Sequence, residues 1–163
     1  MFPKTSRFQP IKPTLIPDAD APLVRLANPG DPKHDLTLNA LARLSKDGQK
    51  LVLVPQCLYE YHVVATRPVQ DNGLGLSETR AIADLDQLIA INHLMDDEPG
   101  IFQKWKSTVG QFKVIGKQAH DARLVAAMNH HGLTCLLTFN DKHFKRFTHL
   151  RVVTPDDVLN GEL

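Results

Sequence analysis

The feature that most constrains the fold of this chain is a helix-to-strand pattern in residues 116–144. Apolar side chains recur there at the three-and-four spacing of one helical face, and they are Ala119, Ala122, Val125, Ala126 and Met128. Gly132 is expected to end this helix, because glycine is favoured just past a helix C-terminus. Residues 133–137 then form a continuous apolar run, which is typical of a central strand covered on both sides.

Polar residues stand at both ends of this helix and strand. Asp121 lies near the start of the helix, and Thr138, Asn140 and Asp141 follow the strand directly. In open α/β sheets, ligands bind in the crevice beyond the carboxyl ends of the strands. The pattern therefore predicts a polar site on a rigid, buried core.

The rest of the chain predicts a parallel α/β sheet with helices on both faces. Further buried strands are expected at residues 14–16, 51–54 and 150–153, separated by helical patterns. Pro55 is expected to open one helix, and Ser77 to cap a longer one. The expected buried stripe of the longer helix is Ala81, Ile82, Leu85, Leu88, Ile89 and Leu94.

Composition bounds the class of protein. The 163 residues, 42% of them hydrophobic, can fill one core, and we expect residues 14–163 to form a single domain. Residues 1–13 hold three prolines and few apolar side chains, which predicts a flexible N-terminal arm. The net charge of +1 excludes an overall field that draws the chain onto nucleic acid, so any such contact requires a local patch. With no leader-like or long apolar segment recognised, we expect a cytoplasmic protein without membrane contact.

Three carboxylates are expected to share one place in this fold. Asp18 follows the first strand, Glu60 lies early in the helix after the second, and Asp121 begins the helix before the third. Clustered carboxylates repel one another unless a cation neutralises them, and oxygen ligands at an open site suit Mg²⁺ or Mn²⁺. The chemistry this implies is metal-assisted phosphodiester hydrolysis. The structural alternative is that the aspartates cap helices and that Glu60 is solvated.

Five segments carry a more specific signal, namely residues 51–61 (LVLVPQCLYEY), 66–68 (TRP), 72–77 (NGLGLS), 120–126 (HDARLVA) and 137–140 (LTFN). Together they resemble the PIN-domain family, in particular the VapC-like toxin ribonucleases of toxin–antitoxin modules. The resemblance implies a PIN-like three-layer α/β/α fold with a short, mainly parallel central sheet of four to five strands. It also implies a metal-dependent endoribonuclease that acts on RNA, is often a homodimer, and is often inhibited by a cognate antitoxin protein.

The resemblance also assigns residues. Asp18, Glu60 and Asp121 match the three principal acids of the family, which implies that they hold Mg²⁺ or Mn²⁺ and are catalytic. Thr138 and Asn140 match its polar positions at the strand end, which implies that they orient water or the metal. Whether one metal or two is used stays open.

The chain departs from the family pattern at two places. Ala19 removes a hydroxyl that usually follows the first acid, and the spacing to the next helix is one residue longer, so Asp20 is an alternative ligand to Asp18. His143 stands where many relatives carry an acid, and Asp141 is the alternative source of that charge.

Basic residues near these acids suggest how a nearly neutral chain holds RNA. Arg67, Lys142, Lys145 and Arg146 are the candidate contacts to RNA phosphates. His120 is expected to support Asp121 through hydrogen bonding rather than to act itself. A second hypothesis is a catalytically weak PIN-like module that binds RNA or a protein partner.

Overall fold

The computed structural model describes residues 14–18 and 22–163, so the predicted N-terminal arm and Asp20 lie outside the described residues. The sheet has five parallel strands in the order β3-β2-β1-β4-β5. The strands are β1 (Thr14–Pro17), β2 (Lys50–Leu53), β3 (His93–Leu94), β4 (Cys135–Leu137) and β5 (Arg151–Val153). The parallel sheet and its strand number agree with the fold class expected from the sequence.

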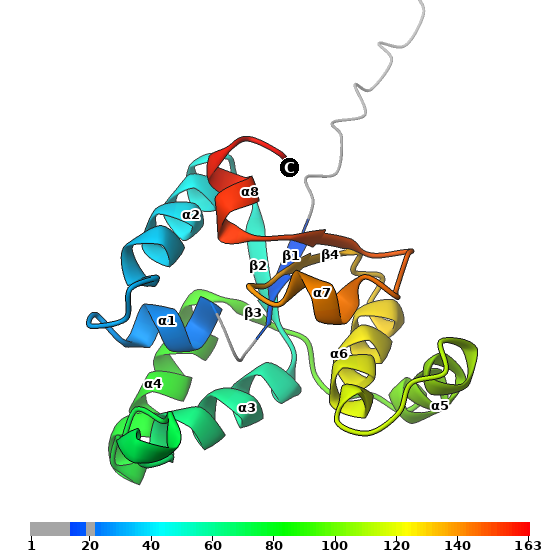
Figure 1. The fold of residues 1–163 in the computed structure, drawn as a ribbon, viewed down its shortest axis with the longest axis horizontal. Helices are drawn as coiled ribbons and strands as arrows, with labels where there is room; N and C mark the ends of the chain where they lie inside the picture. Colours follow the sequence, from blue (N-terminus) through cyan, green and yellow to red (C-terminus); the bar gives the residue numbers. More distant parts are fainter. Residues whose placement is uncertain (1–13, 19–21) are drawn as a thin grey trace, which may run out of the picture.

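Helices connect these strands (Figure 1). They are α1 (Val24–Ala27), α2 (His34–Lys46), α3 (Pro55–Thr66), α4 (Glu78–Ile91), α5 (Ile101–Gln111), α6 (Gln118–His130), α7 (Asp141–Phe144) and α8 (Pro155–Leu159), with a 3₁₀ turn at Val69–Asp71. Pro55 opens α3, and the Ser77 side chain accepts a hydrogen bond from the Arg80 backbone N–H at the start of α4. The two helix starts predicted from proline and serine are therefore confirmed.

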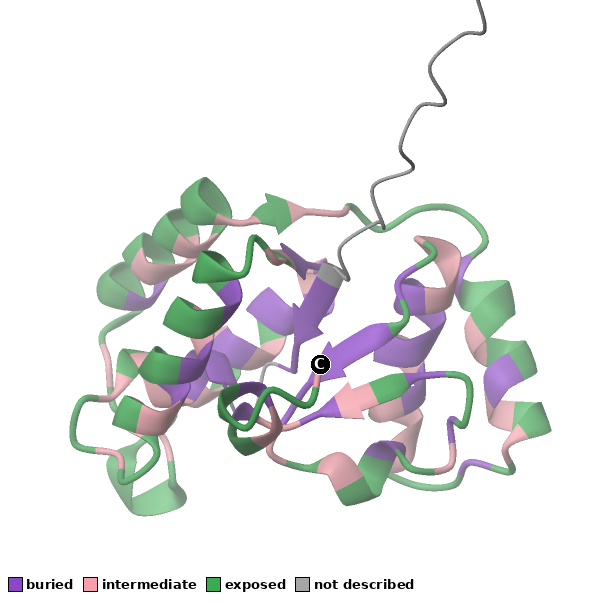
Figure 2. Ribbon diagram, turned by 90° about the horizontal axis from the view of Figure 1, so that it is seen from above, coloured by how far each residue is buried: buried purple, intermediate pink, exposed green. Residues whose placement is uncertain are grey.

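Alternate side chains of the strands point into two separate cores. On one face, Ile16 and Leu136 pack with the buried sides of α3 and α6. On the other face, Leu15 and Leu137 pack with α2 and α8. In Figure 1, α2 and α8 lie together on one side of the strands, and α3 and α6 lie on the other. Figure 2 shows the buried residues concentrated on the central strands and on the helices next to them.

The region after Ser77 differs from the expectation. The helix ends at Ile91 instead of continuing to Leu94, which lies in β3 at the edge of the sheet. Ile82 and Ile89 were expected to be buried, but both are exposed. Periodicity shows that a helix has an apolar face, and it does not show whether that face is covered within the same chain.

The strand order places a switch point between β1 and β4. Chain connections leave β1 toward β2 on one side, and β4 and β5 lie on the other side. Pro17 pairs with Leu137, and the Asp18 backbone N–H donates to the Leu137 carbonyl at 2.8 Å. The residues that follow the two strands are thereby held side by side, where a doubly wound sheet opens a crevice. None of the helices in the described part combines the length and apolar character needed to cross a membrane.

Candidate functional site

A cleft of about 630 Å³ lies at this end of the sheet. It brings together four of the five predicted catalytic residues, and these are Asp18, Glu60, Asp121 and Asn140. Arg67, Lys117, His120 and His143 line the same cleft. We call it the acidic cleft, after the three carboxylates that reach it from β1, α3 and α6.

Asp18 is fixed by the strand next to it. The residue is buried, and its Oδ2 accepts a hydrogen bond from Thr138 Oγ1 at 2.8 Å. Thr138 is fully buried, and its hydroxyl also accepts the backbone N–H of Asn140 at 2.9 Å. Thr138 therefore orients Asp18 and shapes the turn that carries Asn140, although Thr138 does not itself line the cleft.

Glu60 is positioned by Gln56, one helical turn earlier on α3. Gln56 Nε2 donates to Glu60 Oε1 at 2.7 Å and to the His120 carbonyl at 2.9 Å. The second bond ties α3 to the first turn of α6, one residue before Asp121. Our sequence reasoning did not identify Gln56. The i, i+4 spacing to Glu60 is the only sign of its role in the sequence, since the contact with His120 spans 64 residues.

Asp121 lies in the first turn of α6, where the helix dipole favours a negative charge. Its Oδ2 lies 3.6 Å from His143 Nδ1, so a protonated imidazole there forms an ion pair with it. His143 therefore stands at the acid cluster, in the place where an acid was expected. The alternative acid, Asp141, instead pairs with Lys145 at 3.3 Å and is not among the residues of the acidic cleft.

The polar groups of the acidic cleft match the ligands that a divalent cation needs. Three carboxylates and an amide oxygen are the hard ligands that Mg²⁺ and Mn²⁺ take, and an open cleft leaves room for the waters that Mg²⁺ keeps. Within residues 14–18 and 22–163, no three His, Cys, Asp or Glu side chains form a group that could hold a metal ion as they stand. The chemistry of the residues lining the cleft fits a hard cation.

Cys57 lies beneath the acids. Its thiol is buried and donates to the Pro17 carbonyl at 3.4 Å. Burial, with the charges of Asp18 and Glu60 adding to it, raises the pKa of Cys57 to about 12. The thiol therefore stays protonated, and Cys57 is a small core residue rather than a nucleophile.

This buried thiol predicts a loss of stability in alkali. An unfolded chain loses the Cys57 proton above the ordinary value of 9.0, whereas the folded chain keeps it up to about 12. The contribution of Cys57 to stability is therefore complete below pH 9 and falls by about 1.4 kcal/mol per pH unit above it. Urea unfolding at pH 7, 9, 10 and 11 should show a shallower alkaline decline in Cys57→Ala than in wild type. Identical slopes in the two proteins would contradict the assignment.

Arg67 is the one predicted RNA contact that lines the acidic cleft. The chain reverses just after it, and a Cβ on Gly73 would lie 2.0 Å from the Arg67 carbonyl oxygen, so only glycine fits there. Of the other predicted contacts, Lys145 pairs with Asp141, and neither Lys142 nor Arg146 is among the cleft residues.

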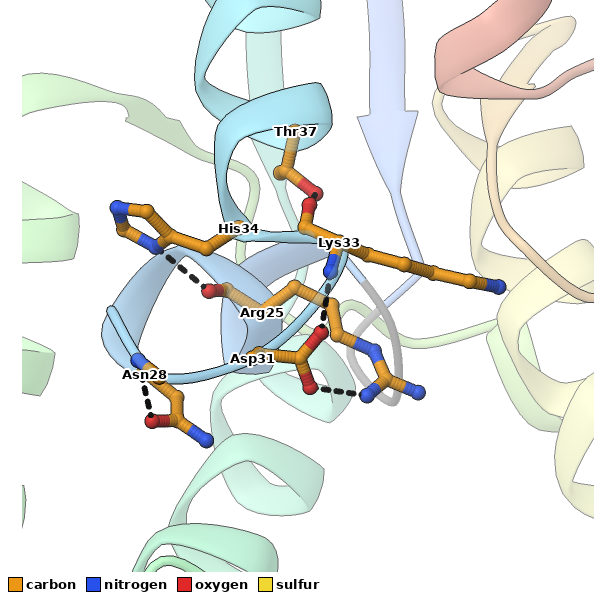
Figure 3. Close-up of polar contacts among 7 residues, drawn as sticks. Arg25, Asn28, Asp31, Lys33, His34 and Thr37 are labelled. Carbon is orange, nitrogen blue, oxygen red and sulfur yellow. Dashed lines mark hydrogen bonds and ion pairs between the residues drawn. The ribbon is translucent and has the colours of Figure 1, made fainter.

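The turn between α1 and α2 holds a group of charged residues and contacts Phe139 after β4. Figure 3 shows Arg25 paired with Asp31, whose Oδ1 accepts the Lys33 backbone N–H at 2.8 Å. Burial opposes ionisation of Asp31, but these two residues hold its pKa below the ordinary value. The Lys33 ammonium lies 4.5 Å from the centre of the Phe139 ring, which follows Thr138. The sequence does not show this contact, because nothing in the local pattern links Lys33 to the strand end.

Comparison with known proteins identifies the class of fold. No protein-family profile matches the chain. Ribonuclease VapC48 of Mycobacterium tuberculosis is 27% identical over 136 residues, which cover 82% of this chain and 92% of that protein. Among solved structures, VapBC2 from Rickettsia felis bound to a promoter DNA fragment aligns with a TM-score of 0.65, 16% identity, and coverage of 86% of this chain and 98% of that chain. VapC20 of Mycobacterium tuberculosis, a toxin that cleaves the sarcin-ricin loop, aligns with a TM-score of 0.59 and 16% identity over 81% and 94% of the two chains.

The chain thus has the PIN-like α/β/α fold of these VapC structures, with acids gathered at the switch point of a parallel sheet. The resemblance to VapC-like proteins that the sequence motifs indicate is confirmed by both kinds of comparison.

Proposed function

We propose that this chain is a metal-dependent endoribonuclease and the toxin component of a toxin–antitoxin pair. The observation that carries the proposal is that Asp18, Glu60 and Asp121 come from three separate elements to line one cleft. The relative with 27% identity is named a ribonuclease, and one structural neighbour is a toxin that cleaves the sarcin-ricin loop.

The three acids would hold Mg²⁺ or Mn²⁺, with Asn140 beside them. When bound, such an ion neutralises charge on the phosphate and lowers the pKa of a bound water. The chain's own groups set the geometry. The Thr138 hydroxyl holds the Asp18 carboxylate, and Gln56 holds Glu60 against the start of α6.

Basic residues around the acidic cleft would hold the RNA backbone. Arg67 lines the cleft and presents a planar fork of donors to a phosphate. Lys142, Lys145 and Arg146 lie on or just after α7, the helix that carries the cleft residue His143, and they would extend the contact. A few such contacts allow a chain with a net charge of +1 to bind RNA locally.

A protein partner is part of the proposal. VapBC assemblies are among the structural neighbours, which supports a cognate antitoxin. On α4, Ile82, Ile89 and Ile91 are exposed apolar side chains, and we propose that a second copy of the chain covers them in a homodimer. Sedimentation of wild type beside Ile89→Glu tests the dimer, since a charge on this face should yield a monomer.

The test of the activity is cleavage of a mixed, structured RNA pool with Mg²⁺, with Mn²⁺ and with a chelator. Wild type should cut only with metal, and Asp121→Asn should cut at least about a hundredfold more slowly. The contact of His143 with Asp121, at a position where an acid was expected, favours one alternative, a catalytically weak binding module. RNA that wild type retains but does not cut above the level of Asp121→Asn would establish that alternative.

A further inference from the structure

A second hollow opens beside the acidic cleft. It has a volume of about 250 Å³ and is lined by Gln56, Tyr59, Glu60, His120 and Arg123. Glu60 and His120 also line the acidic cleft, so the two spaces meet at these residues. We call the second hollow the side pocket. A molecule that extends beyond the acidic cleft between α3 and α6 enters it.

Two polar atoms of the side-pocket residues lack a hydrogen-bond partner within the described chain. Gln56 Nε2 faces two acceptors, Glu60 Oε1 and the His120 carbonyl, which fixes the orientation of the amide and leaves Gln56 Oε1 buried and unpaired. Arg123 Nη2 donates to Asp97 Oδ1 at 2.6 Å, whereas Arg123 Nη1 is buried and unpaired.

This pair of unpaired atoms indicates the kind of ligand. A buried donor or acceptor without a partner costs free energy, and a ligand that supplies the partner recovers it. Two residues that line the pocket carry these buried atoms, an acceptor on Gln56 and a donor on Arg123. The matching ligand carries a donor and an acceptor along one edge, after a small adjustment of the two side chains.

The third feature of the side pocket, besides the two unpaired atoms, is the Tyr59 ring. Its side chain is 63% exposed on α3, one residue before Glu60, although an aromatic ring gains most when it is covered. An exposed aromatic ring beside polar groups is the arrangement on which unpaired bases stack. A phosphate is a poor occupant here, because the Glu60 carboxylate lines the pocket and repels it.

We propose that the side pocket binds a nucleobase, the one adjoining the phosphate held in the acidic cleft, and that Tyr59 stacks on its ring. The inference rests on the proposed ribonuclease function and adds to it the subsite that selects the nucleotide beside the cut. Every nucleobase presents donors and acceptors on its edge, as the Gln56 and Arg123 groups require. A base held there needs an unpaired strand, so substrates are single-stranded loops or ends.

The test measures binding of the four nucleoside 5′-monophosphates and of ribose 5-phosphate, each with Mg²⁺, by NMR titration. In wild type, at least one nucleotide should bind roughly tenfold more tightly than ribose 5-phosphate, which lacks the base. Tyr59→Ala should reduce this preference to near unity, and Tyr59→Phe should keep it, because phenylalanine retains the stacking face. Phe102→Ala is the matched control, since Phe102 is 60% exposed on α5 and does not line either pocket.

The outcomes separate this inference from the ribonuclease proposal. Nucleotides that bind no better than ribose 5-phosphate, or a preference that survives Tyr59→Ala, would overturn the base subsite even if RNA is cut. A preference that depends on Tyr59 would support the subsite even if no RNA is cut, and the ribonuclease proposal would then fail alone. Circular dichroism checks that each variant is folded.

Discussion

Replacing Asp18 with asparagine is expected to lower RNA cleavage by at least about a hundredfold without destabilising the metal-free protein. Residues that only support metal ligands already account for 10- to 100-fold effects, so a proposed ligand should exceed this range. Asp18 is 6% exposed, and its carboxylate accepts a hydrogen bond from the Thr138 hydroxyl. An asparagine oxygen accepts the same hydrogen bond, so the variant should keep the local structure while losing a carboxylate that could bind the metal.

Three measurements on Asp18→Asn decide the matter. Cleavage is followed with Mn²⁺, the free energy of unfolding is measured in urea with chelator, and the rise in melting temperature on adding Mn²⁺ is compared with wild type. The variant should not cleave RNA, and its melting temperature should not rise on adding Mn²⁺. Its free energy of unfolding with chelator should equal that of wild type. Asp86→Asn, an exposed change on α4, is the control and should alter none of them. Full activity in Asp18→Asn would transfer the role to Asp20, the alternative that the sequence leaves open.

The helix-to-strand unit at the centre of the fold was predictable because its signals are local. The apolar face of α6, the glycine after it and the buried run of β4 lie within about twenty consecutive residues. The sequence also places Asp18 and Thr138 directly after predicted strands, and they lie side by side because these parallel strands are neighbours that end together. Apolar periodicity predicts the helix-to-strand unit, and the parallel direction of the strands predicts that polar residues gather at one edge of the sheet.

Other parts of the fold depend on contacts that the sequence does not display. Strand β3 has two residues, too few for an alternating pattern, and it exists because β2 offers it an open edge. The apolar side chains of α4 recur with the spacing of a buried helix face, although Ile82 and Ile89 are exposed. In the site, the link from Gln56 to His120 joins residues 64 positions apart, and it becomes visible only when α3 and α6 are packed together.

Truncating Phe144 to alanine should lower the free energy of unfolding by about 3–5 kcal/mol. Phe144 lies at the end of α7 with 1% of its surface exposed, and its ring centre is 6.4 Å from that of Phe147. Phe147 in turn meets Phe112 edge to face at 5.1 Å, so the cavity would open inside a group of three rings. The surrounding backbone can collapse only in part, which is why such cavities are costly.

Urea unfolding of Phe144→Ala beside Phe102→Ala tests this prediction, because the same substitution is made at a buried and at an exposed position. Phe102 is 60% exposed and stacks on Trp105 at 5.7 Å, so its loss should cost less than about 1 kcal/mol. Equal effects of the two changes would show that α7 is not anchored by the core. Because α7 also carries His143, whose Nδ1 lies 3.6 Å from Asp121, loosening this helix should weaken Mn²⁺ binding before the sheet unfolds. Phe144 would then connect the stability of the core to the geometry of the acidic cleft.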